Sequence, residues 1–355
     1  MITQKISGKD YREEATIFNT YCEIYNTVFE KKLPASVFHY KHYENPFKLS
    51  SPIFGCKIDD NIGGINGFLA AKFICGAQEV YAAQSCDSAV LKQYRGKGVF
   101  TAIIKEAQEQ LQFEGVDFLF GFPNSNSYPG FIKLGWKHET DFCRFFLPID
   151  WYVLLKNKIG KACAYIAHAL LTKITLFRLN RLAAEPVNCT INSYNCCPFS
   201  EEDCATINNC GQIMAKRSIG YYTFRLDANP TQNFEYVVAR EENRLLGFIV
   251  YYVYNNEINI VDWFCSSHNN TFFILAKIIK QLLGQGAKIN ILMVNTSSEE
   301  AEVMRRLGFW NSANKIFRRP KSPLIIYSMN KAIETELHTP KKWLLRHIDN
   351  DTIIS

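Results

Sequence analysis

Gln93-Tyr94-Arg95-Gly96-Lys97-Gly98-Val99-Phe100 brings two glycines and two cations to the start of a predicted helix. An extended pattern precedes this stretch, and helical periodicity follows it over residues 101–114. The first-turn N–H groups of a helix have no partners within the helix, and the helix dipole makes that end positive. Glycine lets a phosphate approach the backbone without striking a Cβ atom. The stretch therefore predicts an anion cradle suited to the pyrophosphate of a nucleotide-like cofactor.

The composition is that of a globular protein with room for two domains of ordinary size. The chain has 355 residues, of which 47% are hydrophobic. Its net charge of +6 favours anionic ligands but is too thinly spread to argue for nucleic acid, so we predict no nucleic-acid partner. No apolar run follows the N-terminal residues 1–5, so we see no signal peptide and expect a cytoplasmic protein.

The cysteine pattern argues against a metal framework. The chain has twelve cysteines but no Cys-x-x-Cys pair. The adjacent pair is Cys196-Cys197, and its nearest neighbours are Cys189, Cys204 and Cys210. Zinc frameworks need paired ligands at short fixed spacings, so a zinc site there is a minor alternative and we predict no metal. Free thiols in a reducing compartment explain the cysteines better.

Residues 52–150 alternate extended and helical patterns around the opening stretch. Three consecutive strands precede the glycines, and a helix, a buried strand, a short helix and a last strand follow them. The predicted strands are Ile53–Ile58, Ile65–Ile74, Val80–Val90, Val116–Phe122 and Phe142–Pro148. This order predicts an α/β (α+β) unit with a mixed, mostly antiparallel sheet.

The signature Gln-x-x-Gly-x-Gly, present as Gln93, Gly96 and Gly98, resembles the acetyl-CoA-binding motif of the GCN5-related N-acetyltransferases (GNATs). The strand that ends in Phe122-Pro123-Asn124 and the segment Phe131–Trp136 match the same family. The resemblance covers about residues 1–150 and is closest to multi-domain members of the enhanced-intracellular-survival type. It implies acetyl-CoA as co-substrate and an amine as acceptor.

The second half of the chain repeats this pattern without the cradle. Leu307-Gly308-Phe309 echoes Leu134-Gly135-Trp136, and superposing the two aligns Phe118–Phe122 with Ile291–Asn295. In this register Gln93, Arg95, Gly96, Lys97 and Gly98 correspond to Ser266, His268, Asn269, Asn270 and Thr271. Both glycines and both cations are lost, so we expect the second copy to bind no CoA.

The chain is therefore predicted to hold two tandem GNAT-like domains, each a mixed sheet flanked by helices. The predicted parts are a CoA-binding domain (1–150), a helical connector (151–186), a degenerate copy (187–330) and a charged, frayed tail (331–355).

The connector is apolar and basic, with no acidic residue before Glu185. We expect an interdomain helix whose apolar face packs inward. Contact with an anionic membrane through 162–182 is the less favoured alternative. Lys173 and Arg178 argue against a membrane span.

The resemblance also implies where acetyl-CoA would bind. Its pantetheine arm would lie between the diverging strands Asp87–Val90 and Leu119–Phe122. Asn124 would complete the cofactor edge, although it could instead cap its own turn. The implied cofactor-binding residues are Ala89, Val90, Arg95, Gly96, Lys97, Gly98, Val99 and Asn124.

Catalysis needs a proton acceptor for the amine and a proton donor for the thiolate. Asp87 is the only acid near the end of its strand, and burial would raise its pKa toward a useful range. Alternatively, it fixes the adjacent turn. The family's acid is a tyrosine at the position of Phe131, so Tyr128 and Ser127 are the candidate donors. Cys86 is a minor nucleophile candidate, because strand alternation points it away from Asp87.

We expect a cytoplasmic acyltransferase that moves an acetyl group from acetyl-CoA to a small amine, with an amino sugar weakly indicated. The second half would shape the acceptor cleft or form a homodimer surface. One alternative is a Fem-type aminoacyl transferase, which the intact glycines disfavour. The other is a non-catalytic CoA-binding sensor or scaffold, which Phe131 suggests.

Overall fold

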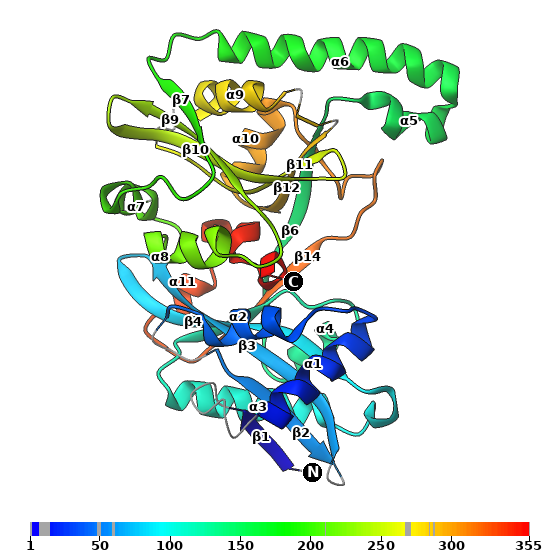
Figure 1. Ribbon diagram of the computed structural model, residues 1–355, viewed down its shortest axis with the longest axis vertical. Helices are drawn as coiled ribbons and strands as arrows, with labels where there is room; N and C mark the ends of the chain where they lie inside the picture. Colours follow the sequence, from blue (N-terminus) through cyan, green and yellow to red (C-terminus); the bar gives the residue numbers. More distant parts are fainter. Residues whose placement is uncertain are drawn as a thin grey trace.

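The computed structural model describes the chain with short gaps. The described residues are 2–6, 15–47, 51–58, 61–209, 211–266, 271–283, 285–286 and 288–354. They form a mixed α/β structure on one large sheet, with separate groups of helices near its two ends (Figure 1). The predicted α/β class is thus confirmed.

The N-terminal half, β1 to β6, follows the predicted order of elements. Helix α3 forms where the sequence has helical periodicity, and it buries Val99, Ile103 and Ile104 against the sheet. The elements are β1 (Ile2–Ile6), α1 (Ala15–Phe29), α2 (Ala35–Tyr43), β2 (Ile53–Ile58), β3 (Asn61–Cys75), β4 (Gln78–Val90), α3 (Val99–Phe113), β5 (Phe118–Gly121), α4 (Tyr128–Lys133) and β6 (Lys137–Pro148).

The connector is helical, as predicted, and the C-terminal half then repeats the order of strands and helices. Gly160, at φ 79°, separates α5 (Trp151–Ile159) from α6 (Lys161–Ala183). The later elements are β7 (Thr190–Tyr194), α7 (Glu201–Asn208), β8 (Met214–Ala215), α8 (Ile219–Tyr222), β9 (Glu235–Glu241), β10 (Arg244–Tyr254), β11 (Glu257–Cys265), α9 (Thr271–Leu282), β12 (Lys288–Asn295), α10 (Glu299–Leu307), β13 (Trp310–Asn311), β14 (Ser322–Ser328) and α11 (Glu334–Leu337).

Each half gives its long last strand to the other half. β14, from the C-terminal half, pairs antiparallel with β5, and β6, from the N-terminal half, pairs antiparallel with β12. β14 and β6 also pair with each other. The described strands therefore form one continuous sheet of fourteen strands, and backbone hydrogen bonds cross between the halves.

The predicted boundary at residue 150 consequently does not separate two sheets. Residues 142–148 were expected to complete the first sheet, but they pair with β12. Their side chains Cys143, Phe145 and Leu147 lie in the core of the C-terminal half. Alternation in a strand identifies its buried face but not the sheet that accepts it, so the sequence pattern alone could not show this exchange.

Residues 331–354, the C-terminal segment, are folded, so the prediction of a frayed tail was wrong. The segment contains α11 and three short 3₁₀ turns, and it lies between the two halves (Figure 1). Trp343, Leu345, Ile348 and Ile354 are all at 0% exposure. The charged residues around them misled the prediction, because the apolar residues between the charged ones carry the packing.

One hydrophobic cluster joins both halves to the C-terminal segment. It includes Phe73 and Phe118 from the N-terminal half, Phe248 from the C-terminal half, and Trp343 and Ile348 from the segment. Burial of this shared apolar surface adds to the strand exchange, so the halves are held together by packing as well as by hydrogen bonds.

We predict that Trp343→Ala lowers the free energy of unfolding by about 3–5 kcal/mol, because it empties a fully buried site. Trp343 packs on Phe118 with ring centroids 5.8 Å apart and donates from Nε1 to the Leu337 carbonyl at 2.9 Å. Chemical denaturation measures the loss. The control Ile316→Ala, at a side chain that is 59% exposed, should change stability little. Equal effects of the two would mean that the segment is not packed as described.

Candidate active site

Strands β4 and β5 run side by side and then part. They pair in parallel from Ala82 opposite Phe118 to Ser85 opposite Gly121. β5 ends at Gly121, whereas β4 continues to Val90. The gap opens at the carboxyl ends of the two strands, where the family resemblance implied that they diverge.

A β-bulge in β4 marks the point where the strands part. Ile65 of β3 lies opposite Ala89 and Gly67 opposite Cys86, so Asp87 and Ser88 share the single partner position between them. Asp87 has a φ of 54°, in the left-handed region that non-glycine residues rarely adopt.

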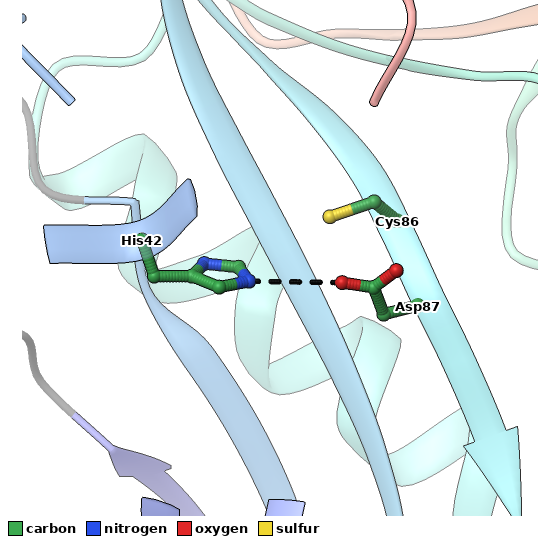
Figure 2. Close-up of side chains that lie close together, drawn as sticks. All are labelled: His42, Cys86 and Asp87. Atoms are coloured by element: carbon green, nitrogen blue, oxygen red, sulfur yellow. Dashed lines mark ion pairs between the residues drawn. The ribbon is translucent and has the colours of Figure 1, made fainter. Parts of the chain in front are cut away.

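The bulge overturns the expected direction of Cys86. Figure 2 shows Cys86 and Asp87 of β4 both pointing toward His42 of α2, and the candidate ligand atoms of the three residues lie within 4.8 Å of one another. The left-handed turn at Asp87 breaks the strand alternation on which the prediction depended. Burial raises the pKa of the Cys86 thiol well above its ordinary value, which disfavours a nucleophilic thiolate.

Asp87 is held by a buried network. The Lys41 ammonium lies 2.9 and 3.0 Å from the two Asp87 oxygens, and the Tyr21 hydroxyl donates to Oδ2 at 2.6 Å. His42 Nε2 lies 3.7 Å from the same oxygen, while Nδ1 contacts the Ser51 carbonyl at 3.0 Å. A Cβ atom on Gly67 would lie 2.7 Å from His42 Cε1, so glycine makes room for the ring.

This network reverses the predicted pKa of Asp87. Burial by itself raises the pKa of that carboxyl, but the Lys41 ammonium and the hydrogen bonds around it outweigh burial and hold the pKa well below its usual range. Asp87 also raises the pKa of Lys41 above its ordinary value, although burial opposes it. The expectation of a raised pKa was wrong, because the sequence did not show that Lys41 lies here. The general-base role of Asp87 stays a prediction, and this geometry disfavours it.

The Lys41 ammonium also bears on metal binding. His42, Cys86 and Asp87 could offer three ligand atoms, but both Asp87 oxygens already contact the ammonium. A positive charge in that place competes with a metal ion. The cysteines that the structure describes are free thiols, and Cys210 lies outside the described residues.

Lys41 also reaches a second carboxylate that the sequence prediction missed. Its Nζ lies 3.3 Å from Asp351 Oδ2, and Gln84 donates to Asp351 Oδ1 at 2.9 Å. Asp351 belongs to the C-terminal segment, in the 3₁₀ turn Asp351–Ile354. The apolar residues Trp343, Leu345 and Ile348 were a sequence signal that this segment folds, although nothing in them pointed to β4.

A cavity of about 280 Å³ lies where the strands part. Residues from four places in the chain surround it. They are Tyr25, Phe29 and Lys31 at the end of α1, Ser85–Ser88 of β4, Gly121–Asn124 with Ser127 and Phe131, and Asp351–Thr352 of the C-terminal segment. Asp351 has a side chain that is 16% exposed, against 3% for Asp87. Of the two carboxylates, Asp351 is therefore the more accessible from the cavity.

The predicted anion cradle lies beside this cavity. Gly96 and Gly98 have φ angles of 76° and 80°, and Gly98 is the N-cap residue that directly precedes α3. Both therefore need the freedom that glycine gives, and the first N–H groups of α3 lie directly after them. Phe100 in the first turn of α3 packs on Phe131, with ring centroids 4.9 Å apart. Since Phe131 lines the cavity, cradle and cavity adjoin.

The two cations of the cradle have contacts of their own. Arg95 Nε donates to the Val90 carbonyl at 3.1 Å, and Lys97 Nζ lies 5.4 Å from the centre of the Tyr94 ring. The Arg95 contact ties the loop to the end of β4. Ala89 is buried in β4, so only its backbone is available to a ligand. The roles of Ala89, Val90, Arg95, Gly96, Lys97, Gly98 and Val99 in cofactor binding stay predictions.

Three residues with predicted roles, Asn124, Ser127 and Tyr128, lie in or next to the turn after β5, and their side chains make different contacts. Asn124 Oδ1 accepts the backbone N–H of Asn126 at 2.9 Å and of Ser127 at 3.1 Å, so it caps the turn, and any ligand contact would come from Nδ2. Ser127 lines the cavity. Tyr128 instead directs its hydroxyl to His138 Nδ1 at 3.1 Å and does not line the cavity. The structure therefore brings Ser127, but not Tyr128, to the cavity.

In the C-terminal half, α9 begins at Thr271, the predicted counterpart of Gly98. Ser266 follows β11. His268, Asn269 and Asn270 lie outside the described residues, so the comparison of the two cradles remains a sequence prediction.

We predict that Asp87→Asn lowers the free energy of unfolding by about 3–5 kcal/mol at pH 7, because it leaves the buried Lys41 charge short of a partner. The folded-state pKa of Asp87 is lowered, so its stabilisation is complete above the ordinary carboxyl value of 3.8 and is lost as the pH falls from there. Denaturation at pH 7, 5 and 3 should therefore show the difference between wild type and variant shrink at pH 3.

Glu79→Gln serves as the matched control for this prediction. Glu79 also pairs with lysines, but its side chain is 41% exposed, so its loss should cost under about 1 kcal/mol. A wild-type advantage over Asp87→Asn that stays constant from pH 7 to pH 3 would contradict the assignment.

Comparisons with known proteins bear on the N-terminal half and on the fold. Residues 13–138 match the family model of the acetyltransferase (GNAT) domain. No curated protein sequence matches the chain significantly. The solved structures that it resembles share little sequence with it, so they speak for the fold alone.

Three of these structures illustrate the likeness. A GCN5-related N-acetyltransferase from Anabaena variabilis has 11% identity and a TM-score of 0.65, over 94% of this chain and 74% of that one. Eis1 from Mycobacterium abscessus has 10% identity and a TM-score of 0.55, over 92% and 74%. A tandem GNAT protein from the clavulanic acid biosynthesis pathway has 9% identity and a TM-score of 0.55, over 93% and 98%.

The resemblance seen in the sequence is thereby confirmed. The glycine cradle, the parted strands β4 and β5 and the family match all fall in one region of the N-terminal half. Residues 13–138 therefore form a domain of the GNAT acetyltransferase family, whose members transfer an acyl group from acyl-CoA to an amine, and the chain as a whole shares the fold of a tandem GNAT protein.

Proposed function

We propose that the protein moves an acetyl group from acetyl-CoA to a small amine in the cavity between β4 and β5. The observation that carries this proposal is the cradle of α3 adjoining a cavity that also holds an accessible carboxylate. Transfer from a thioester to an amine needs the two reactants held together and two protons managed, and it needs little covalent help from the protein.

The cradle is suited to hold the pyrophosphate of acetyl-CoA. The N–H groups at the start of α3 supply donors and the helix dipole supplies positive potential. A Cβ atom built on Gly98 would meet nothing within 4 Å, so the space around it is open to a ligand. The pantetheine arm would then run along the open edge of β4 beyond Ser85, where β5 no longer pairs with it.

We assign the general base to Asp351 rather than to Asp87. Both carboxylates contact the Lys41 ammonium. Asp87 is the more tightly held, because each of its two oxygens contacts the ammonium and one also accepts the Tyr21 hydroxyl. The Asp87 side chain is also the more deeply buried of the two. Asp351 has one longer contact to Lys41 and faces the cavity. In this arrangement Asp351 accepts the proton of the amine, while Asp87 and Lys41 hold its carboxylate in place.

The leaving thiolate needs less help than an alkoxide, because thiol pKa values are far below those of alcohols. Phe131 lines the cavity at the position of the family's tyrosine and cannot donate a proton. Of the two predicted proton donors, Ser127 and Tyr128, only Ser127 lines the cavity. We therefore propose the Ser127 hydroxyl as the proton donor. Tyr128 has no place in this mechanism, since its hydroxyl contacts His138.

The C-terminal half would serve the same site as a degenerate copy that binds no CoA itself. Its repeated order of elements and the loss of the glycines and cations at residues 266–271 support this interpretation. Through the C-terminal segment it supplies Asp351 and Thr352 to the wall of the acceptor cavity.

Phe131 favours one alternative, a protein that binds CoA without catalysis. A sensor of that kind needs the cradle but no proton donor. The intact cradle glycines argue against a Fem-type aminoacyl transferase, which would use aminoacyl-tRNA in place of CoA.

We predict that acetyl-CoA raises the melting temperature of the protein and that Gly98→Val abolishes this shift. Gly115→Val is the matched control, because Gly115 has a similar φ of 85°, open space around it and a place at the other end of the same helix. The two variants should lose similar stability, but only Gly98→Val should lose the response. An unchanged response in Gly98→Val would refute the cradle assignment.

We predict that Asp351→Asn lowers kcat by about 10²–10⁴-fold, the range typical of a lost general base, and leaves acetyl-CoA binding unchanged. Thiol release across a panel of small amines gives the rates, and titration gives the affinity. Thr352→Val changes the neighbouring residue of the same wall and should have a small effect. Acetyl-CoA binding without turnover on any amine would favour the sensor.

A further inference from the structure

Helices α5 and α6 lie on the outside of the C-terminal half. In Figure 1, α6 forms the top edge of the molecule, above α9. The end of α6 packs against α9, where Leu179 and Leu182 join its hydrophobic cluster. The rest of the helix does not have its apolar face turned inward, so the prediction of an inward-packed connector was wrong for most of its length.

A stripe of large apolar side chains follows the outer face of α6. Ile166, Leu170, Ile174 and Phe177 recur at the spacing of one helix face, and they are 71%, 59%, 54% and 71% exposed. Tyr165 flanks the stripe at 70% exposed. Single exposed apolar residues are ordinary, but a contiguous stripe of this kind marks a contact surface.

The charges around the stripe have one sign. Residues 151–184 contain six lysines and arginines and no aspartate or glutamate. Of these, Lys161, Lys173, Arg178 and Arg181 are exposed on α6. Their long side chains can lie along apolar surface and place the charge at its border.

The exposed apolar stripe and the cations around it together indicate what binds to the outer face of α6. A second copy of the chain would bring two sets of like charges face to face, which is unfavourable. An anionic phospholipid surface offers acyl chains to the stripe and phosphates to the cations, so a helix with exposed apolar and basic side chains can bind such a surface in its plane.

The helix is suited to lie on a membrane rather than to cross it. By length and composition α6 could span a bilayer. However, Ala164 and Leu179 are buried at 0% exposure against the protein, and Lys173 and Arg178 would be placed in the hydrocarbon.

We propose that the outer face of α6 docks this protein on an anionic phospholipid surface. The docking face lies at the opposite end of the molecule from α3 and its cradle (Figure 1). A docked molecule would therefore keep its CoA site open to the solvent. This proposal does not depend on the acyl-transfer activity.

Flotation of the full chain with lipid vesicles tests the proposal. We expect binding to vesicles of equal parts phosphatidylglycerol and phosphatidylcholine, weakened by salt, and little binding to phosphatidylcholine alone. Phe177→Asp should reduce partitioning more than tenfold, since it replaces an apolar side chain with an acid. The double variant Lys173→Gln, Arg181→Gln should reduce it roughly fivefold for each cation lost.

Matched controls change equally exposed residues elsewhere. Phe113→Asp alters a side chain that is 94% exposed at the end of α3, and Lys331→Gln removes an exposed cation of the C-terminal segment. Neither control should alter vesicle binding, and all variants should melt like the wild type. Failure to bind anionic vesicles, equal binding to neutral ones, or equal losses in the controls would overturn the proposal. So would a dimer in sedimentation that Phe177→Asp dissociates, because the stripe would then be a protein interface.

Discussion

The exchange of last strands is the constraint on which the rest of this structure depends. A strand that lies in the middle of a sheet has backbone partners on both sides, so β14 cannot leave without exposing unpaired groups of β5 and β6. The N-terminal half therefore lacks a complete sheet without the C-terminal half, and the reverse holds for β6 and β12. This arrangement fixes where the chain runs after β14, and hence where the C-terminal segment packs.

Two buried cations, Arg217 and Lys41, then fix the position of the C-terminal segment through ion pairs. Arg217 pairs with Asp349 and with Asp262 of β11, and it ties the segment to the C-terminal half. Two residues farther on, Asp351 meets Lys41 of the N-terminal half. Buried charges are costly unless they are paired, so the chain between these contacts has little freedom. The position of Asp351 beside the bulge of β4 thus follows from contacts made by both halves.

The sequence predicted what depends on local pattern and missed what depends on distant contacts. The glycines, the helix after them and the end of β5 were found because turns, helix starts and apolar periodicity are local properties. The effect of burial on Asp87 was considered, but its Lys41 partner is 46 residues away and Asp351 farther still. The bulge that turns Cys86 toward Asp87 has no sequence signal of its own, and the exchange of β6 and β14 leaves each strand's alternation unchanged.

The same reasoning explains how the C-terminal half, which binds no CoA in the proposed function, can still matter to the site. In the proposed function only the N-terminal half binds CoA, so the other half is free of the backbone requirements that fix Gly96 and Gly98. It remains necessary for a different reason, because it supplies β14 to the sheet and Asp351 to the cavity. A separated N-terminal half would leave β5 as an edge strand and Lys41 with Asp87 alone. The site is therefore a property of the whole chain, although its family signature lies in residues 13–138.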